Sequence, residues 1–195
     1  MRAVPSATTR AWASRKDCEA ALPHILAAPK DNAPIETLCF RTGYSERRFP
    51  QSIKVSAKRG IEGERWLQDA WLRCVNGSPD PRIQICILPQ RVSELCWRDR
   101  DNTIHPGDTM IADLDMTEAN MPAGTRLKIG SAVIEVSNVF NTACAKWRAR
   151  YGGDSMAWIN YRSYRALRLR GVLCRVVEDG EISAADHIRK LGCQY

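Results

Sequence analysis

The chain has 195 residues, of which 44% are hydrophobic and 26% charged, a balance typical of one globular domain with a sizeable core. No apolar run approaches the roughly 20 residues that a membrane-spanning helix needs, and residues 1–13 lack the apolar segment of a secretory signal. The formal net charge is +7, and the segment 146–170 alone holds seven basic residues and one acid. We therefore expect a cytoplasmic protein without a membrane partner, carrying a basic patch that attracts anions.

The first part of the chain predicts a helix, a loop and a β-hairpin. Residues 14–28 fit a helix that Ser14 caps and Pro23 breaks or restarts. The loop PKDNAP follows, so we assign residues 1–30 to a helical extension and residues 31–195 to the main domain. Residues 35–41 and 49–56 are rich in β-formers and flank a turn at GYSE, which favours pairing between them.

Short strands continue along the rest of the chain. Residues 83–88 predict a buried strand, 90–97 a short helix and 109–114 a further strand. Residues 126–129 and 132–139 predict a hairpin around Gly130-Ser131. Residues 143–151 predict a helix that Gly152-Gly153 ends, and Asp154 is expected to cap a second one. With strands at 171–177 and 187–191, the pattern predicts a mainly β fold with short helices, a closed or nearly closed barrel.

The eight cysteines do not form a recognisable metal or disulfide pattern. No CxxC pair exists and the three histidines are scattered, so a structural zinc site is not expected. Cys39, Cys86 and Cys174 lie in apolar runs, and we interpret them as small buried hydrophobes in a reducing cytoplasm.

Several stretches resemble the MOSC family, which is named after the C-terminus of molybdenum cofactor sulfurases and includes small standalone proteins. They are GDTMIADLDMTEANMPAGTRLKIGSAVIEVSN, TACAKWRARYG and INYRSYRALRLRGVLCRVVEDGEISAADHI, with looser matches at APKDNAPIETLCFRTGYSERRF and RGIEGERWL. Together they cover roughly residues 20 to 190. The resemblance implies a MOSC-type β-barrel and binding of the molybdenum cofactor, molybdopterin.

In this family a cysteine after the central hairpin is the residue proposed to hold molybdenum or to carry sulfur, and here it falls on Cys144. The residues themselves supply reasons for a thiolate there. Cys144 begins a predicted helix, whose free N–H groups favour negative charge, and Lys146 and Arg148 add positive potential. For a cysteine without such neighbours, a plain buried residue is the better interpretation.

The resemblance also implies residues for the phosphate and pterin ring of the cofactor. Guanidinium groups and amides suit such a ligand. Arg65, Asn160 and Arg165 fall in the matching stretches, and Lys146 adds charge beside Cys144, so these four are the candidate cofactor-binding residues. The implied reaction is reduction of N-oxygenated small molecules or sulfur transfer. No flavin or iron–sulfur motif is visible, so a reductase would need a separate electron-donor protein.

Other interpretations stay open. Asp113 and Asp115 share one face of the predicted strand 109–114 and, with Asp108 and Glu118, suggest a Mg²⁺ hydrolase, which we rate below the cofactor hypothesis. A non-catalytic anion- or nucleic-acid-binding module is the second alternative, because aromatic residues interleave with the basic ones between positions 146 and 170. Helical spacing explains these aromatics equally well, so we do not expect nucleic acid.

Overall fold

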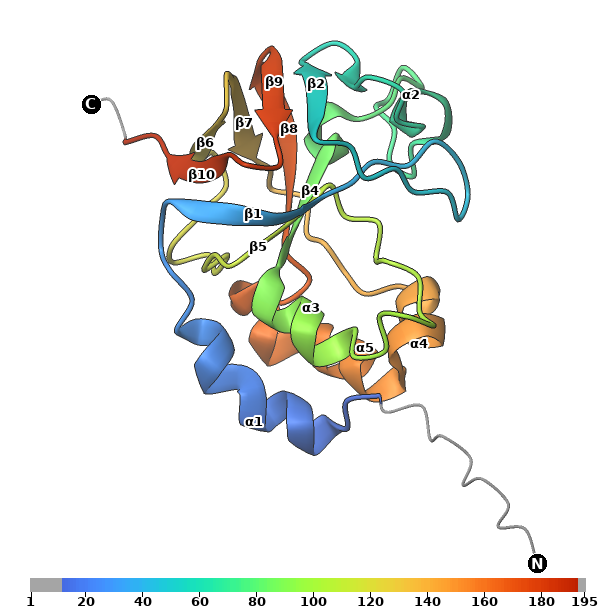
Figure 1. The fold of residues 1–195 in the computed structure, drawn as a ribbon, viewed down its shortest axis with the longest axis vertical. Helices are drawn as coiled ribbons and strands as arrows, with labels where there is room; N and C mark the ends of the chain where they lie inside the picture. Colours follow the sequence, from blue (N-terminus) through green and yellow to red (C-terminus); the bar gives the residue numbers. More distant parts are fainter. Residues whose placement is uncertain (1–11, 193–195) are drawn as a thin grey trace, which may run out of the picture.

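The computed structural model describes residues 12–192 as a closed barrel with a layer of helices at one end (Figure 1). The barrel order is β1 (Ala33–Leu38), β10 (His187–Lys190), β6 (Arg126–Ile129), β7 (Ala132–Val136), β8 (Val172–Glu178), β4 (Ile85–Pro89) and β5 (Met110–Ala112). Neighbours are antiparallel except β4 and β5, which are parallel. The predicted barrel is therefore confirmed.

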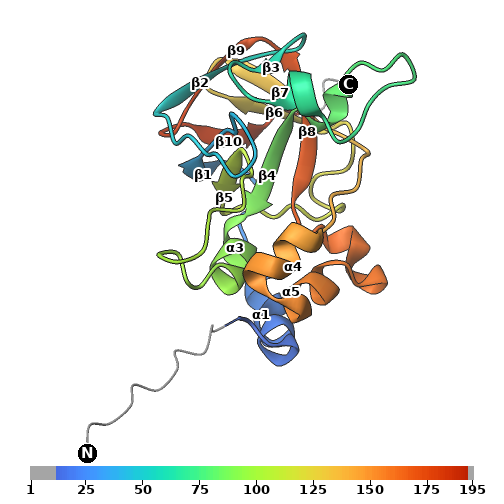
Figure 2. The ribbon, with the colours of Figure 1, turned by 90° about the vertical axis from the view of Figure 1, so that its right-hand side faces the viewer.

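A smaller sheet and the helices complete the fold. Strands β2 (Ser52–Ser56), β3 (Gly60–Ile61) and β9 (Gly180–Ser183) form a three-stranded sheet in the order β3-β2-β9. Figures 1 and 2 both show α1 (Arg15–Leu26), α3 (Gln90–Cys96), α4 (Ala145–Tyr151) and α5 (Gly153–Ile159) gathered below the barrel. The short α2 (Trp66–Asp69) and 3₁₀ turns at Pro81–Ile83 and Arg162–Leu167 connect other elements. No helix in the described range is long and apolar enough to cross a membrane.

Two large apolar cores stabilise this arrangement, and a smaller third cluster packs Trp66 with Ile83 and Leu173. The barrel interior is filled by aliphatic side chains such as Ile85, Ile87 and Leu127, all fully buried. The second core lies among the helices, where Trp147 and Trp158 are almost completely buried. Burial of aromatic side chains of this size contributes strongly to folding. The helical layer is therefore anchored to the barrel end, and α4 is held from beneath.

Most local predictions are confirmed. Ser14 caps α1 with a reciprocal capping box to Asp17. The hairpin of β6 and β7 turns at Gly130-Ser131, as the two-residue signature predicts. The boundary between residues 30 and 31 stays a prediction. Residues 1–11 of the predicted extension lie outside the described residues, whereas α1 packs against α3 and α5.

Three local predictions are wrong. Residues 35–41 and 49–56 do not pair as a hairpin, because β1 pairs with β10 and β5, and β2 pairs with β3 and β9. An isolated bridge joins Phe40 to Arg48, just before the second of these segments. Pro23 does not interrupt α1, since it sits near the last turn and its carbonyl still accepts from Ala27 N at 3.1 Å. Asp154 does not cap α5, because its carboxylate instead accepts from Arg15 N at 3.0 Å.

Candidate functional site

Cys144 lies at the surface, at the start of α4. It is the N-cap residue of that helix, with an extended backbone, and its carbonyl accepts from Arg148 N at 3.1 Å. Its side chain makes no capping hydrogen bond and the thiol is free and exposed. The thiol can therefore reach a ligand outside the protein, which a cysteine sealed in the core could not do.

Two side-chain amides fix the segment that leads to Cys144. Asn160 Oδ1 accepts from Ala143 N at 2.9 Å, and its Nδ2 donates to Ala143 O at 2.8 Å. Asn141 Nδ2 donates to Arg170 O at 3.0 Å. In this structure the paired amide of Asn160 is thus engaged by the backbone next to Cys144, and a direct contact with a pterin stays a prediction.

Two of the predicted cofactor-binding cations meet on one aromatic ring near Cys144. The Tyr44 ring centroid lies 4.5 Å from Arg65 Cζ and 4.9 Å from Lys146 Nζ. Arg65 also forms an ion pair with Asp69, and its Nε is buried without an acceptor. The structure therefore brings together Arg65 and Lys146, which are far apart in sequence.

Arg165 lies elsewhere. Its Cζ is 4.2 Å from the centroid of the Phe140 ring, and it lines a pocket between residues 137–141 and 165–173. Asn141 also lines this pocket, so the pocket reaches the segment that carries Cys144. A cofactor-binding role for Arg165 stays a prediction.

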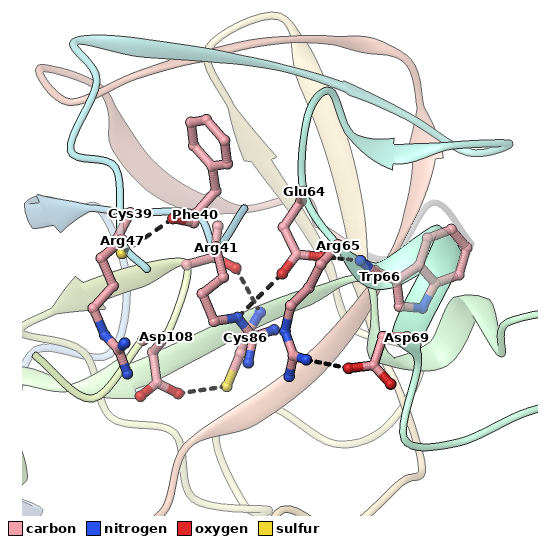
Figure 3. A network of polar contacts seen from close by, with 12 residues as sticks. Cys39, Phe40, Arg41, Arg47, Glu64, Arg65, Trp66, Asp69, Cys86 and Asp108 are labelled. Atoms are coloured by element: carbon pink, nitrogen blue, oxygen red, sulfur yellow. Dashed lines mark hydrogen bonds and ion pairs between the residues drawn. The ribbon is translucent and has the colours of Figure 1, made fainter. Parts of the chain in front are cut away.

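A buried polar network beneath the site was not predicted from the sequence. Asp108 Oδ1 accepts from Arg170 Nη1 and from Cys86 Sγ, both at 2.7 Å. Figure 3 shows Asp108 and Cys86 close to arginines of the 41–65 segment. Arg170 Cζ lies 4.8 Å from the centroid of the Trp147 ring. The network therefore joins the barrel to α4 through Trp147. Cys86 is a polar partner rather than the plain buried hydrophobe that we expected.

Electrostatics keep this network charged. Burial alone would raise the pKa of Asp108, but the Arg170 guanidinium outweighs it and the pKa lies below its usual value. Burial alone would lower the pKa of Arg170, but the Asp108 carboxylate outweighs it and the pKa lies above its usual value. Burial and the neighbouring carboxylate raise the pKa of the Cys86 thiol well above its usual value. Asp108 and Arg170 are therefore a buried ion pair, and Cys86 is a neutral hydrogen-bond donor.

His105 is buried beside this network and stays neutral. Its Nδ1 accepts from Gly107 N at 3.0 Å, and its ring lies 5.2 Å from the rings of both Phe49 and Trp97. Burial lowers the pKa of His105 from 6.5 to about 4, although Asp108 acts in the opposite direction. His105 Nε2, Asp108 Oδ2 and Arg47 Nη1 are buried without a hydrogen-bond partner.

The His105 pKa predicts a loss of stability in acid. Between pH 6.5 and 4 the unfolded chain binds a proton at this residue and the folded protein does not, so the free energy of unfolding falls as the pH falls. This interval corresponds to about 3 kcal/mol. The variant His105→Asn keeps an acceptor for Gly107 but cannot bind this proton. Between pH 7 and pH 4 in urea unfolding, we expect its free energy of unfolding to fall by about 3 kcal/mol less than that of the wild type. Equal losses would show that His105 is not responsible.

The residues behind the two rival interpretations have other partners. Asp113 forms an ion pair with Arg91 at 2.7 Å, and Asp115 accepts from Thr117 N at 2.9 Å. Residues 12–192 contain no group of three or more His, Cys, Asp or Glu side chains that could hold a metal ion. Of the aromatics between positions 146 and 170, the exposed one is Tyr161, because the others are wholly or partly buried. Base stacking along this segment therefore has one available ring.

Comparison with known proteins agrees with the fold. Residues 100–189, which include Asp108 and Cys144, match the family model described as MOSC domain. Residues 100–189 of the chain thus correspond to a MOSC domain. No curated protein sequence matches it. The family match covers the second half, so the looser resemblance of the first half is not part of it.

Solved structures share the architecture of this chain. The YuaD protein from Bacillus subtilis aligns with a TM-score of 0.58 and 17% identity over 80% of this chain and 94% of that chain. YiiM from Escherichia coli aligns with a TM-score of 0.55 and 17% identity over 83% of this chain and 70% of that chain. At such identities the likeness concerns the fold.

Sequence reasoning missed Tyr44, Asp108 and Arg170 as parts of the site. Asp108 was weighed only within an acidic cluster and Arg170 only within the basic patch, because their partnership spans 62 residues. Tyr44 was read as part of a turn. A weak signal for Asp108 existed, because it follows a glycine at the start of a MOSC-like stretch. Nothing in the sequence indicates that Arg170 is its partner.

Proposed function

We propose that this MOSC-domain protein binds a molybdenum–pterin cofactor, with Cys144 as the thiolate ligand of the metal or as the carrier of a transferred sulfur. The observation that carries the proposal is the exposed Cys144 thiol at the start of α4, two residues from Lys146 and near the Lys146–Tyr44–Arg65 cluster. Molybdenum in this cofactor is already held by dithiolene sulfurs, so one further soft anionic ligand suffices.

The residues present fit such a group. The buried Arg65 Nε has no acceptor in the described structure, and a phosphate oxygen would supply one. Arg47 Nη1 is also buried without an acceptor. Burial and the nearby positive charge of Arg150 lower the pKa of Arg47. Neighbouring positive charges repel one another unless carboxylates neutralise them, so an anionic ligand would stabilise them. Lys146, Arg65 and Arg47 are thus the residues that would hold the anionic end of the cofactor.

When bound, the cofactor supplies two-electron chemistry for reduction of an N-oxygenated small molecule. The protein's own task is to hold the Cys144 thiol, through Asn160 and Asn141, and to bind anionic groups through the basic cluster. A reductase also needs electrons, and we propose a separate donor protein. The described cysteines are all free, which suits a reducing cytoplasm.

Metal analysis tests the proposal. We expect molybdenum in protein made in a host that produces the cofactor, and we expect Cys144→Ser to lose most of it, since the hydroxyl is a harder and weaker ligand. Cys74→Ser is the matched control, because Cys74 is also a free, partly exposed cysteine and lies outside α4, in the loop between α2 and the 3₁₀ turn Pro81–Ile83. Equal molybdenum in wild type and Cys144→Ser, or none in either, would contradict the role of Cys144.

The alternative is a non-catalytic anion-binding module that keeps the barrel without redox chemistry. The unpartnered Arg65 and Arg47 donors favour it equally, because they require an anion and not a metal. Retention of anions with no molybdenum in the wild type would support this alternative.

A further inference from the structure

One exposed aromatic ring holds two cations from distant parts of the chain. Tyr44 lies in the loop between β1 and β2 and is 68% exposed. Arg65 and Lys146 both lie within the range of cation–π attraction to its ring. Lys146 belongs to the first turn of α4, the helix that begins after Cys144, so the ring is held by the same helix start as the proposed functional thiol.

The charge around this ring is not fully compensated. Arg65 has Asp69 as an ion-pair partner, whereas Lys146 forms no ion pair with any described residue. The Arg65 Nε donor is buried and has no acceptor. An anionic group placed here would gain charge-assisted hydrogen bonds without breaking existing ones.

The exposed ring adds a second element of recognition. A bare anion needs only the two cations, whereas a planar ligand can also contact the ring of Tyr44, whose side chain is largely exposed. Phe49, in the same loop and 55% exposed, offers a comparison. Its ring contacts the His105 ring, and no cation lies over it in the described structure. Tyr44 is thus distinguished from its neighbour by the cations and not by exposure.

We infer that Tyr44 is a stacking platform for a planar heteroaromatic ring whose phosphate or carboxylate group is bound by Arg65 and Lys146. This inference rests on the proposed function and deepens it, because it adds a residue that selects the ligand. Offset stacking is attractive for any electron-poor heteroaromatic ring, and the neighbouring cations fix which end of the ligand faces Cys144.

Binding of pterin-6-carboxylate to the purified full-length chain tests this inference through the change in the fluorescence of the pterin. We expect Tyr44→Ala to weaken binding roughly tenfold, as removal of a stacked aromatic commonly does. Tyr44→Phe keeps the ring and should bind within about twofold of the wild type, and the matched control Phe49→Ala should do the same. Thermal unfolding of each variant checks that it folds, which the exposure of both side chains favours.

Three results would overturn the inference. They are absence of pterin binding to the wild type, unchanged affinity in Tyr44→Ala, and an equal loss in Phe49→Ala. Competition by inorganic phosphate together with unchanged affinity in Tyr44→Ala would identify a simple anion site instead. Because the probe contains no metal, Cys144→Ser should bind it normally. Failure of the proposed function, a wild type without molybdenum, is therefore distinguishable from failure of the Tyr44 platform.

Discussion

The substitution Gly171→Ala is expected to destabilise the protein severely. Gly171 has φ +82°, and a Cβ atom built there would lie 1.9 Å from Ile87 O and 3.0 Å from Leu88 Cα. Both are backbone atoms around β4, so no side-chain rotation relieves the overlap. We expect the free energy of unfolding to fall by on the order of 4–5 kcal/mol, at the upper end for single substitutions. For a chain of this length the melting temperature would fall by roughly 10 °C or more.

Gly77 provides a matched control for the cost of placing alanine in a left-handed backbone conformation. It has nearly the same φ, +81°, but no atom lies within 4 Å of a Cβ built there. Gly77→Ala therefore carries only the conformational cost of a left-handed backbone, about 1–2 kcal/mol. The difference between the two variants in urea unfolding measures the close approach of the strands. If Gly171→Ala lost no more than Gly77→Ala, the packing of β8 against β4 would differ from that described.

The position of Gly171 also couples the barrel to the site. It follows Arg170, whose carbonyl accepts from Asn141 and whose guanidinium binds Asp108. A backbone shift at Gly171 would therefore displace the anchor of the segment that precedes Cys144.

The sequence predicts the local parts of this structure and misses the distant partnerships. The β6–β7 hairpin is predicted correctly because two neighbouring strands and a Gly130-Ser131 turn specify each other. The failed hairpin of residues 35–41 and 49–56 has equally good strand propensity. In that case closure of the barrel determines the pairing, because β1 must pair with β5 and with β10, which is about 150 positions away. Strand propensity contains no information about a partner so distant.

The residues of the candidate site also divide into those that local sequence predicts and those whose contacts depend on the fold. The place of Cys144 at a helix start could be predicted because a helix pattern, a cysteine and nearby cations occur within a few positions, whereas its role stays a prediction. Asn160 was predicted as an amide contact, but its target in this structure is Ala143, 17 residues earlier. The burial or exposure of the arginines depends on the fold, which encloses most of the Arg65, Arg168 and Arg170 side chains.

Removal of the Asp108 charge should be the second severe substitution. Asp108→Asn keeps the size of the side chain but leaves the Arg170 guanidinium without its counter-ion, and the Asp108 and Arg170 side chains are only 1% and 14% exposed. Breaking one partner of a buried ion pair typically costs about 3–5 kcal/mol, because the remaining charge stays desolvated. The exposed pair of Arg100 and Glu36 is the control, and Glu36→Gln should cost less than about 1 kcal/mol in the same urea experiment.

A double variant separates the effect of the buried charges on stability from the effect of the network on the geometry of the site. In Asp108→Asn with Arg170→Met no charge remains buried, so we expect part of the stability lost in Asp108→Asn to return. The double variant nevertheless loses the guanidinium over the Trp147 ring, and that contact connects the network to α4. We therefore expect recovered stability without recovered molybdenum or pterin binding, which would indicate that the buried charge is retained for the geometry around Cys144. Additive losses in the two single variants, with no recovery in the double, would show that Asp108 and Arg170 do not act as a pair.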